Sequence, residues 1–136
     1  MDRRPAVGGS RFLDRAELTA LALVGVALGA GVLCAALLSR HEPQSAAVTA
    51  WLIGHALVAF ALRARPTLGP RQNPAFWAWS AAATAAGVIL AATPAGHAFG
   101  LAELSAAGWG HVAVGLAVMA ALAVAGRAGL RLGRRL

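Results

Sequence analysis

The chain has 136 residues, of which 59% are hydrophobic and 12% charged, and its mean hydropathy is +0.67. This composition excludes a soluble globular domain, because such domains carry about a quarter of charged residues. All 12 basic residues are arginines, and they exceed the 5 acidic residues to give a net charge of +7. Since the arginines stand between long apolar runs, they indicate membrane topology, and we expect no nucleic-acid partner.

Four apolar runs follow a basic arm at residues 1–15. Each is close to the length of about 20 residues that a helix needs to cross a bilayer. The sequence therefore predicts an all-α, integral membrane four-helix bundle within residues 16–126, and a basic tail at 127–136. The expected spans are 18–38, 45–62, 74–93 and 109–126.

The arginines predict the orientation of the bundle. Only Arg40 falls in the first or third connection; the other arginines lie in the arm, the middle connection and the tail. Because basic residues concentrate on the cytoplasmic side, we expect both termini to be cytoplasmic. We expect a multi-pass protein of the plasma (cytoplasmic) membrane of a bacterium.

Tryptophans and small residues mark span ends and packing faces. Trp77, Trp79 and Trp109 lie near the starts of the third and fourth spans, where tryptophan anchors a helix at the membrane interface. Gly25 and Gly29 form a G-x-x-x-G pair, which allows helices to approach closely. We expect this pair to pack against the chain's own helices rather than to form a dimer face.

His55 is the deepest polar side chain of the four spans and the main candidate for chemistry. It is either a packing histidine, hydrogen-bonded to Thr49, a backbone carbonyl or another helix, or a residue of an ion path. His55 and His111 differ in depth by about 10 Å, which disfavours a haem held between them, and we expect no cofactor. His41 and His97 are expected at the interface, as is His111.

Catalytic signatures are missing from the sequence. It contains no Asp-Lys-Thr-Gly phosphorylation motif, Walker A loop, H-E-x-x-H motif or cluster of carboxylates. The single cysteine, Cys34, cannot form a disulfide or a thiolate cluster within one chain. We therefore expect no enzyme activity from the chain by itself and no firm metal site.

The order of these segments resembles the last four membrane helices of cation-transporting P-type ATPases. The run Ser45-Ala-Ala-Val-Thr-Ala-Trp-Leu-Ile-Gly-His55 is similar to the antepenultimate helix, where a Thr-x-x-Phe-x-Thr opening leads to a polar residue ten positions later. Residues 73–79 are similar to the entry of the penultimate helix, and residues 97–104 to the outer loop with its Phe-x-x-x-x-Leu pattern. Trp109 matches the opening of the final helix, and residues 1–5 match a cytoplasmic Met-x-Arg-x-Pro segment.

The resemblance implies a membrane-embedded, C-terminal support domain of a pump. Without catalytic domains, such a chain is expected to be a stand-alone, split or truncated part that serves cation transport only with a partner, either the remaining ATPase domains or a homo-oligomer. His55 stands where calcium-pumping relatives carry a carboxylate or amide, so calcium specificity does not carry over. Ser45 and Val48 also depart from the pattern. The alternative is a small autonomous four-helix membrane transporter or a scaffold.

Overall fold

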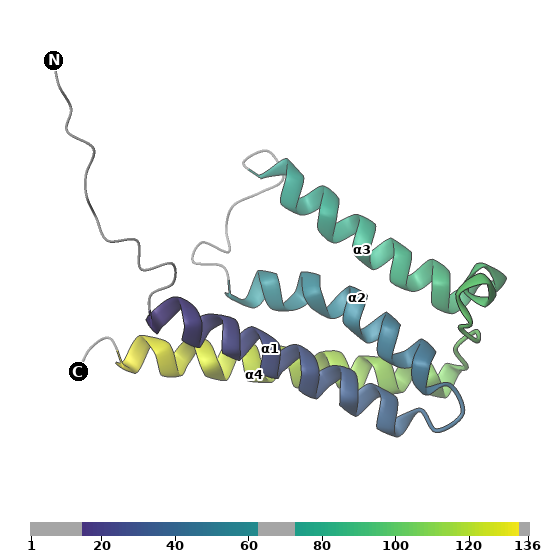
Figure 1. Ribbon diagram of the computed structural model, residues 1–136, viewed down its shortest axis with the longest axis horizontal. Helices are drawn as coiled ribbons and strands as arrows, with labels where there is room; N and C mark the ends of the chain where they lie inside the picture. Colours follow the sequence, from purple (N-terminus) through teal and green to yellow (C-terminus); the bar gives the residue numbers. More distant parts are fainter. Residues whose placement is uncertain (1–14, 63–72, 134–136) are drawn as a thin grey trace, which may run out of the picture.

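The computed structural model describes residues 15–62 and 73–133 of the chain (Figure 1). It contains four long helices, α1 (Arg15–Leu38), α2 (Pro43–Leu62), α3 (Pro74–Ala92) and α4 (Ala106–Gly133), and a short 3-10 helix, η1 (Pro94–Phe99), between α3 and α4. No strand occurs in these two described ranges. Each long helix contains a stretch that is long and apolar enough to cross a membrane. The prediction of an all-α four-helix membrane bundle is confirmed.

The start and end of α3 show how the local sequence sets helix bounds. The Asn73 side chain caps the helix by accepting a hydrogen bond from the Phe76 N–H at 3.1 Å. Pro74 follows as the first helical residue, where its missing N–H costs nothing. At the other end Thr93 is extended, because it precedes Pro94 and a residue before proline disfavours the helical conformation.

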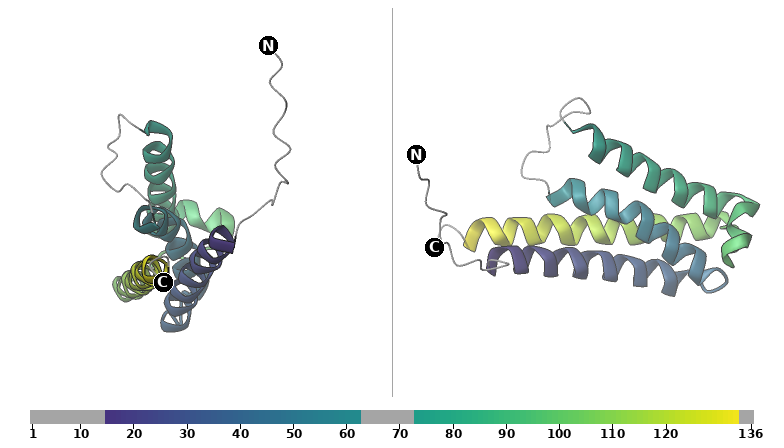
Figure 2. Two further views of the ribbon diagram at one scale, coloured as in Figure 1. Left: turned by 90° about the vertical axis from the view of Figure 1, so that its left-hand side faces the viewer. Right: turned by 45° about the horizontal axis from the view of Figure 1, so that its top comes forward.

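Three of the four helices form the core of the bundle. α1, α2 and α4 contact one another pairwise, whereas α3 contacts only α2 and η1 among the described elements (Figure 2). Met119 on α4 is fully buried at the centre. A Cβ atom added to Gly31 of α1 or to Gly54 of α2 would collide with its side chain. Small residues thus let the three helices approach closely, and the flexible methionine fills the space that remains.

Three helices are longer than the apolar runs that predicted them. α1 begins at Arg15 rather than at 18, and α2 begins at Pro43 rather than at 45. α4 runs from Ala106 to Gly133 rather than from 109 to 126. Residues 127–133 of the expected tail are therefore helical. The apolar run marks the part of a helix that fits the bilayer, but a hydrogen-bonded helix continues through arginine and leucine, which are good helix formers.

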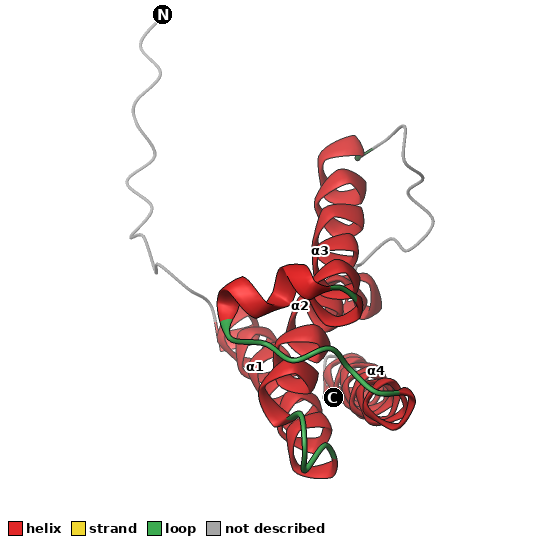
Figure 3. Ribbon diagram, turned by 90° about the vertical axis from the view of Figure 1, so that its right-hand side faces the viewer, coloured by secondary structure: helices red, strands yellow, loops and turns green. Residues whose placement is uncertain are grey.

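The connection between α3 and α4 is folded against the bundle and is more ordered than the loop expected there. The Thr93 hydroxyl accepts the Ala95 N–H at the start of η1. Gly100 ends η1 with a φ of 72°, a conformation that favours glycine. The N–H of Leu104 then donates to the Ala91 carbonyl at 2.8 Å. Figure 3 shows this segment crossing the end of the bundle to reach α4.

Candidate functional site

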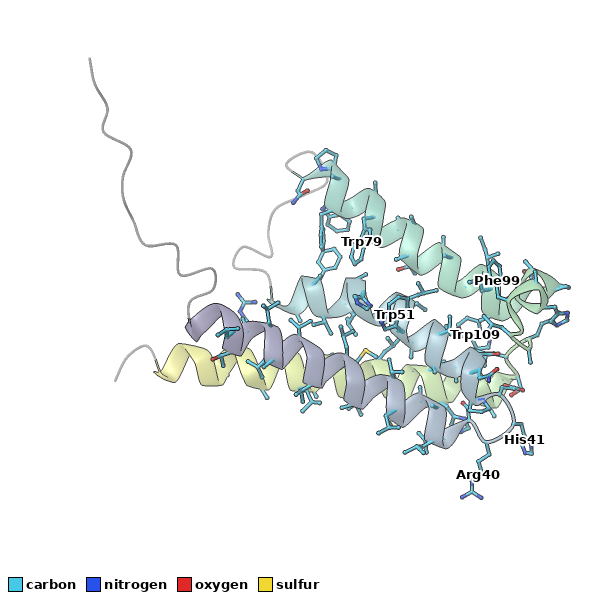
Figure 4. All side chains as sticks on the ribbon, in the orientation of Figure 1. Arg40, His41, Trp51, Trp79, Phe99 and Trp109 are labelled. Carbon is cyan, nitrogen blue, oxygen red and sulfur yellow. The ribbon has the colours of Figure 1, made fainter. Side chains whose placement is uncertain are left out.

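His55 lies on α2 at an open pocket between α2 and α3. The pocket has a volume of about 260 Å³ and is also lined by Trp51, Leu52, Trp79 and Ala83. Figure 4 shows the labelled Trp51 and Trp79 in the space between the two helices. The structure therefore brings one of the expected interface tryptophans, Trp79, to the same pocket as the candidate histidine.

The hydrogen bond of His55 defines which ring nitrogen carries the lone pair that can accept a proton or bind a ligand. Nδ1 lies 2.8 Å from the carbonyl oxygen of Trp51, one turn earlier in the same helix. A carbonyl can only accept, so Nδ1 carries the hydrogen, and the lone pair of the neutral ring is on Nε2. The imidazole also stands edge-on to the Trp51 indole, with ring centroids 4.8 Å apart. α2 alone thus orients the ring and leaves Nε2 as the basic atom at the pocket.

The other histidines lie away from His55, at the end of the bundle where α2 begins (Figure 1). His41 in the α1–α2 turn and His97 in η1 are exposed. His111 on α4 is half-buried, and its Nδ1 lies 3.1 Å from the hydroxyl oxygen of buried Ser39. In the described parts of the chain, no three His, Cys, Asp or Glu side chains are placed to hold a metal ion.

A polar network that the sequence did not reveal joins the α1–α2 turn to the start of α4. Oε2 of Glu42 accepts hydrogen bonds from the backbone N–H and the hydroxyl of Ser105, at 3.0 and 3.2 Å. The Ser105 hydroxyl oxygen also caps α4 by accepting the Gly108 N–H. An open pocket of about 240 Å³ lies beside this network, and Arg40 and His41 point away from the bundle (Figure 4). The only sequence signal was a serine ahead of an apolar run, as in many helix caps.

The expected packing pair, Gly25 and Gly29, is not used inside the described bundle. Both residues are exposed on α1, and a Cβ added to either would meet no atom within 4 Å. The close approach between α1 and α4 occurs instead at Gly31 and Gly115, where an added Cβ would meet the backbone of the facing helix. The close approach is therefore at Gly31, a position that the sequence analysis did not single out, and within the described helices no neighbour faces Gly25 or Gly29.

The expected interface tryptophans occur at both ends of the bundle. Trp77, near the start of α3, packs edge-on against Phe60 near the end of α2, with centroids 4.9 Å apart. Trp79 is 47% exposed, and Trp109, near the start of α4, packs against the core. Anchoring of these side chains at a membrane interface stays a prediction.

The fold defines the class of protein: four apolar helices of spanning length make this chain a multi-pass integral membrane protein. A family model described as "Cation transporting ATPase, C-terminus" matches residues 1–128. Because the match covers nearly the whole chain, the chain belongs to this family, the non-catalytic C-terminal membrane part of cation-transporting P-type ATPases. The resemblance seen in the sequence is thereby confirmed. Neither a curated protein nor a solved structure matches the chain.

Proposed function

We propose that this chain is a membrane support that serves cation transport only when it is assembled with the catalytic domains of a P-type ATPase. The observation that carries the proposal is the family match over residues 1–128. The sequence adds that the phosphorylated aspartate motif and a nucleotide-binding loop are not present in these 136 residues. The chain then contributes helices and a scaffold, and the energy of ATP comes from its partner.

Phosphate release from reconstituted vesicles tests this proposal. The purified chain, supplied with Mg²⁺, ATP and a series of monovalent and divalent cations, should release no vanadate-sensitive phosphate. Addition of a polypeptide that carries the Asp-Lys-Thr-Gly motif and the preceding membrane helices of a pump should give cation-dependent release above that polypeptide's own rate. Vanadate-sensitive release by the chain alone, with contaminating pumps excluded by mass spectrometry, would contradict the proposal.

Within an assembled pump, His55 is the residue of this chain that we assign to the ion path. Two arguments support the assignment: the resemblance described in the sequence analysis places His55 at a polar position of the family pattern, and in the structure Nδ1 is used by the Trp51 carbonyl, which leaves the lone pair on Nε2. Imidazole nitrogen binds protons and borderline transition metals, whereas Ca²⁺ and Mg²⁺ prefer oxygen. In the assembled pump, replacing His55 by Leu should abolish transport while assembly persists.

We also propose that both termini face the cytoplasm, in the plasma membrane of a bacterium. The support is the distribution of arginines along the sequence, in which Arg40 stands apart from the other eleven. Single cysteines placed at positions 69 and 103 on a Cys34→Ser background test this orientation. Position 103 should react with an impermeant maleimide added to intact cells, and position 69 should react only after the cells are opened. The reverse pattern would overturn the orientation.

A further inference from the structure

The His55 pocket has an indole on each of its two walls. Trp51 of α2 and Trp79 of α3 line it together (Figure 4), and about half of each side chain is exposed, 50% and 47% respectively. The other residues of the lining, Leu52 and Ala83, are apolar. An indole N–H can donate a hydrogen bond but cannot accept one. Among the described side chains of the pocket, Nε2 of His55 is therefore the atom that offers a lone pair to a ligand.

A single nitrogen ligand favours a proton over a metal ion. A bound transition metal takes about four ligands, drawn from imidazole, thiolate and carboxylate groups. Trp51, Leu52, Trp79 and Ala83 supply none of these. Nowhere in residues 15–62 and 73–133 do three His, Cys, Asp or Glu side chains come together in a way that could hold a metal. A proton, in contrast, needs one lone pair.

The imidazole is placed so that a positive charge on it is stabilised. Its Nδ1 lies 2.8 Å from the Trp51 carbonyl oxygen, and a hydrogen on Nδ1 serves this bond in both the neutral and the protonated ring. The imidazole and the Trp51 indole stand nearly perpendicular, at 84°, with ring centroids 4.8 Å apart. An indole attracts a cation that lies within about 6 Å of its ring centroid. Trp51 therefore contributes both an acceptor and a π system.

Among the described residues, no other charged or titratable side chain lines this pocket. α2 has no second residue that titrates, and α3, which faces His55 across the pocket, has none. Arg127, which reaches α2 from α4, donates to the Ala61 carbonyl, about 9 Å further along α2 than His55. The other such groups on the two helices that pack against α2 are Arg15, Glu17, Cys34, His111 and Arg131. A charged His55 ring thus meets neither a carboxylate nor a competing cation, and the indoles are the groups that stabilise it.

We propose that the His55 pocket is a proton-binding site. A proton adds to the lone pair of Nε2, Nδ1 keeps its hydrogen and its bond to the Trp51 carbonyl, and the indoles of Trp51 and Trp79 stabilise the imidazolium. The inference rests on the proposed function where it names the ion that His55 takes in an assembled pump as a proton. The protonation itself needs no partner and is measured on this chain alone.

Nitrogen-15 NMR of the histidine-labelled chain in detergent micelles follows the two ring nitrogens, and His55→Asn identifies the signals of His55. At alkaline pH the hydrogen should be on Nδ1 and the lone pair on Nε2. Between about pH 8 and 5, the range in which histidine changes charge, Nε2 should gain a hydrogen while Nδ1 keeps its own. Zn²⁺ added at alkaline pH should leave the His55 signals unchanged. An Nε2 that gains no hydrogen, or His55 signals that shift with Zn²⁺, overturns the proposal.

Tryptophan substitutions test how the charge is stabilised. Trp51→Leu should lower the proton affinity of His55 about threefold, or half a pH unit, the contribution of one cation–π contact at an exposed site. Trp79→Leu should lower it as well, and Trp51→Phe, which keeps an aromatic face, should recover most of the affinity. Trp77→Leu is the matched control, because Trp77 is also on α3 but does not line this pocket, and it should leave the affinity unchanged. An equal loss in Trp77→Leu and Trp51→Leu contradicts stabilisation by the indoles.

The two proposals fail separately. A chain that raises phosphate release when it is added to the catalytic polypeptide, but whose His55 takes up no proton, overturns the proton site and leaves the support function standing. A chain whose His55 titrates as stated supports the proton site even where phosphate release is not raised.

Discussion

Glu42 and Ser105, which lie 63 residues apart in the sequence, are joined by two hydrogen bonds to one carboxylate oxygen. Ser105 is at the same time the residue whose hydroxyl caps α4. The carboxylate therefore lies at the positive end of the α4 dipole and also ties the α1–α2 turn to the start of α4. This arrangement sets how the three core helices meet at one end of the bundle.

Replacing Glu42 by alanine should lower the free energy of unfolding by about 1 kcal/mol, because the Ser105 N–H and hydroxyl lose their acceptor. The measurement is reversible unfolding in mixed micelles, followed by circular dichroism. Glu103→Ala is the matched control, since Glu103 is an exposed acid of the connection that contains Ser105, and its cost should stay within about 0.5 kcal/mol. Equal losses for the two variants would show that the Glu42 bonds contribute nothing specific.

A second prediction contrasts two glycines of α1. Gly31→Ala should destabilise the bundle, because the new Cβ would meet Met119 and the backbone of Gly115. Overpacking of this kind costs about 1–3 kcal/mol, which exceeds the gain of about 1 kcal/mol from the higher helix propensity of alanine. Gly25→Ala has that gain without the clash, since no atom lies within 4 Å of its added Cβ.

Thermal unfolding of both glycine variants in the same detergent measures this difference. We expect the midpoint to fall for Gly31→Ala and to rise or stay unchanged for Gly25→Ala. A lower midpoint for Gly25→Ala in a monomeric preparation would mean that Gly25 packs inside the bundle after all.

The sequence was sufficient to predict the four helices, because the length and apolar character of each run are local properties. It could not predict which glycine faces a neighbour. G-x-x-x-G spacing identifies a face of α1 but not its partner, and the close approach to α4 is at Gly31, on another face. The uniform hydrophobicity of the spans also hid the peripheral position of α3, since no polar face distinguishes lipid from protein.

One part of the candidate site could be predicted from the sequence and another part could not. The backbone carbonyl that His55 binds is one turn earlier in its own helix, so a bond of this kind could be anticipated from the sequence. The Glu42–Ser105 pair could not, because it depends on how the α1–α2 turn meets the connection that crosses the end of the bundle.

Arg127 should stabilise the contact between α4 and α2. Its guanidinium donates to the Ala61 carbonyl, one of the last-turn carbonyls of α2 that have no partner within the helix. Arg127→Gln should cost about 1 kcal/mol, through the lost hydrogen bond and the lost charge at the negative helix end. Arg40→Gln, which removes one positive charge from an exposed residue, is the control and should change the unfolding midpoint little. The two midpoints, compared at low and at high salt, separate the local bond from general charge effects.

His55→Leu tests how the candidate histidine is held. An interhelical hydrogen bond in a membrane protein contributes about 0.6–1 kcal/mol, and its loss would be measurable. The bond of His55 is instead to the Trp51 carbonyl within α2, and leucine also avoids the cost of a polar ring in an apolar surrounding. We therefore expect His55→Leu to change the free energy of unfolding of this chain by less than about 0.5 kcal/mol. His55→Asn serves as the control, since its shorter amide stays polar. A loss of 1 kcal/mol or more in His55→Leu alone would indicate that the imidazole bridges helices and that its role in this chain is packing.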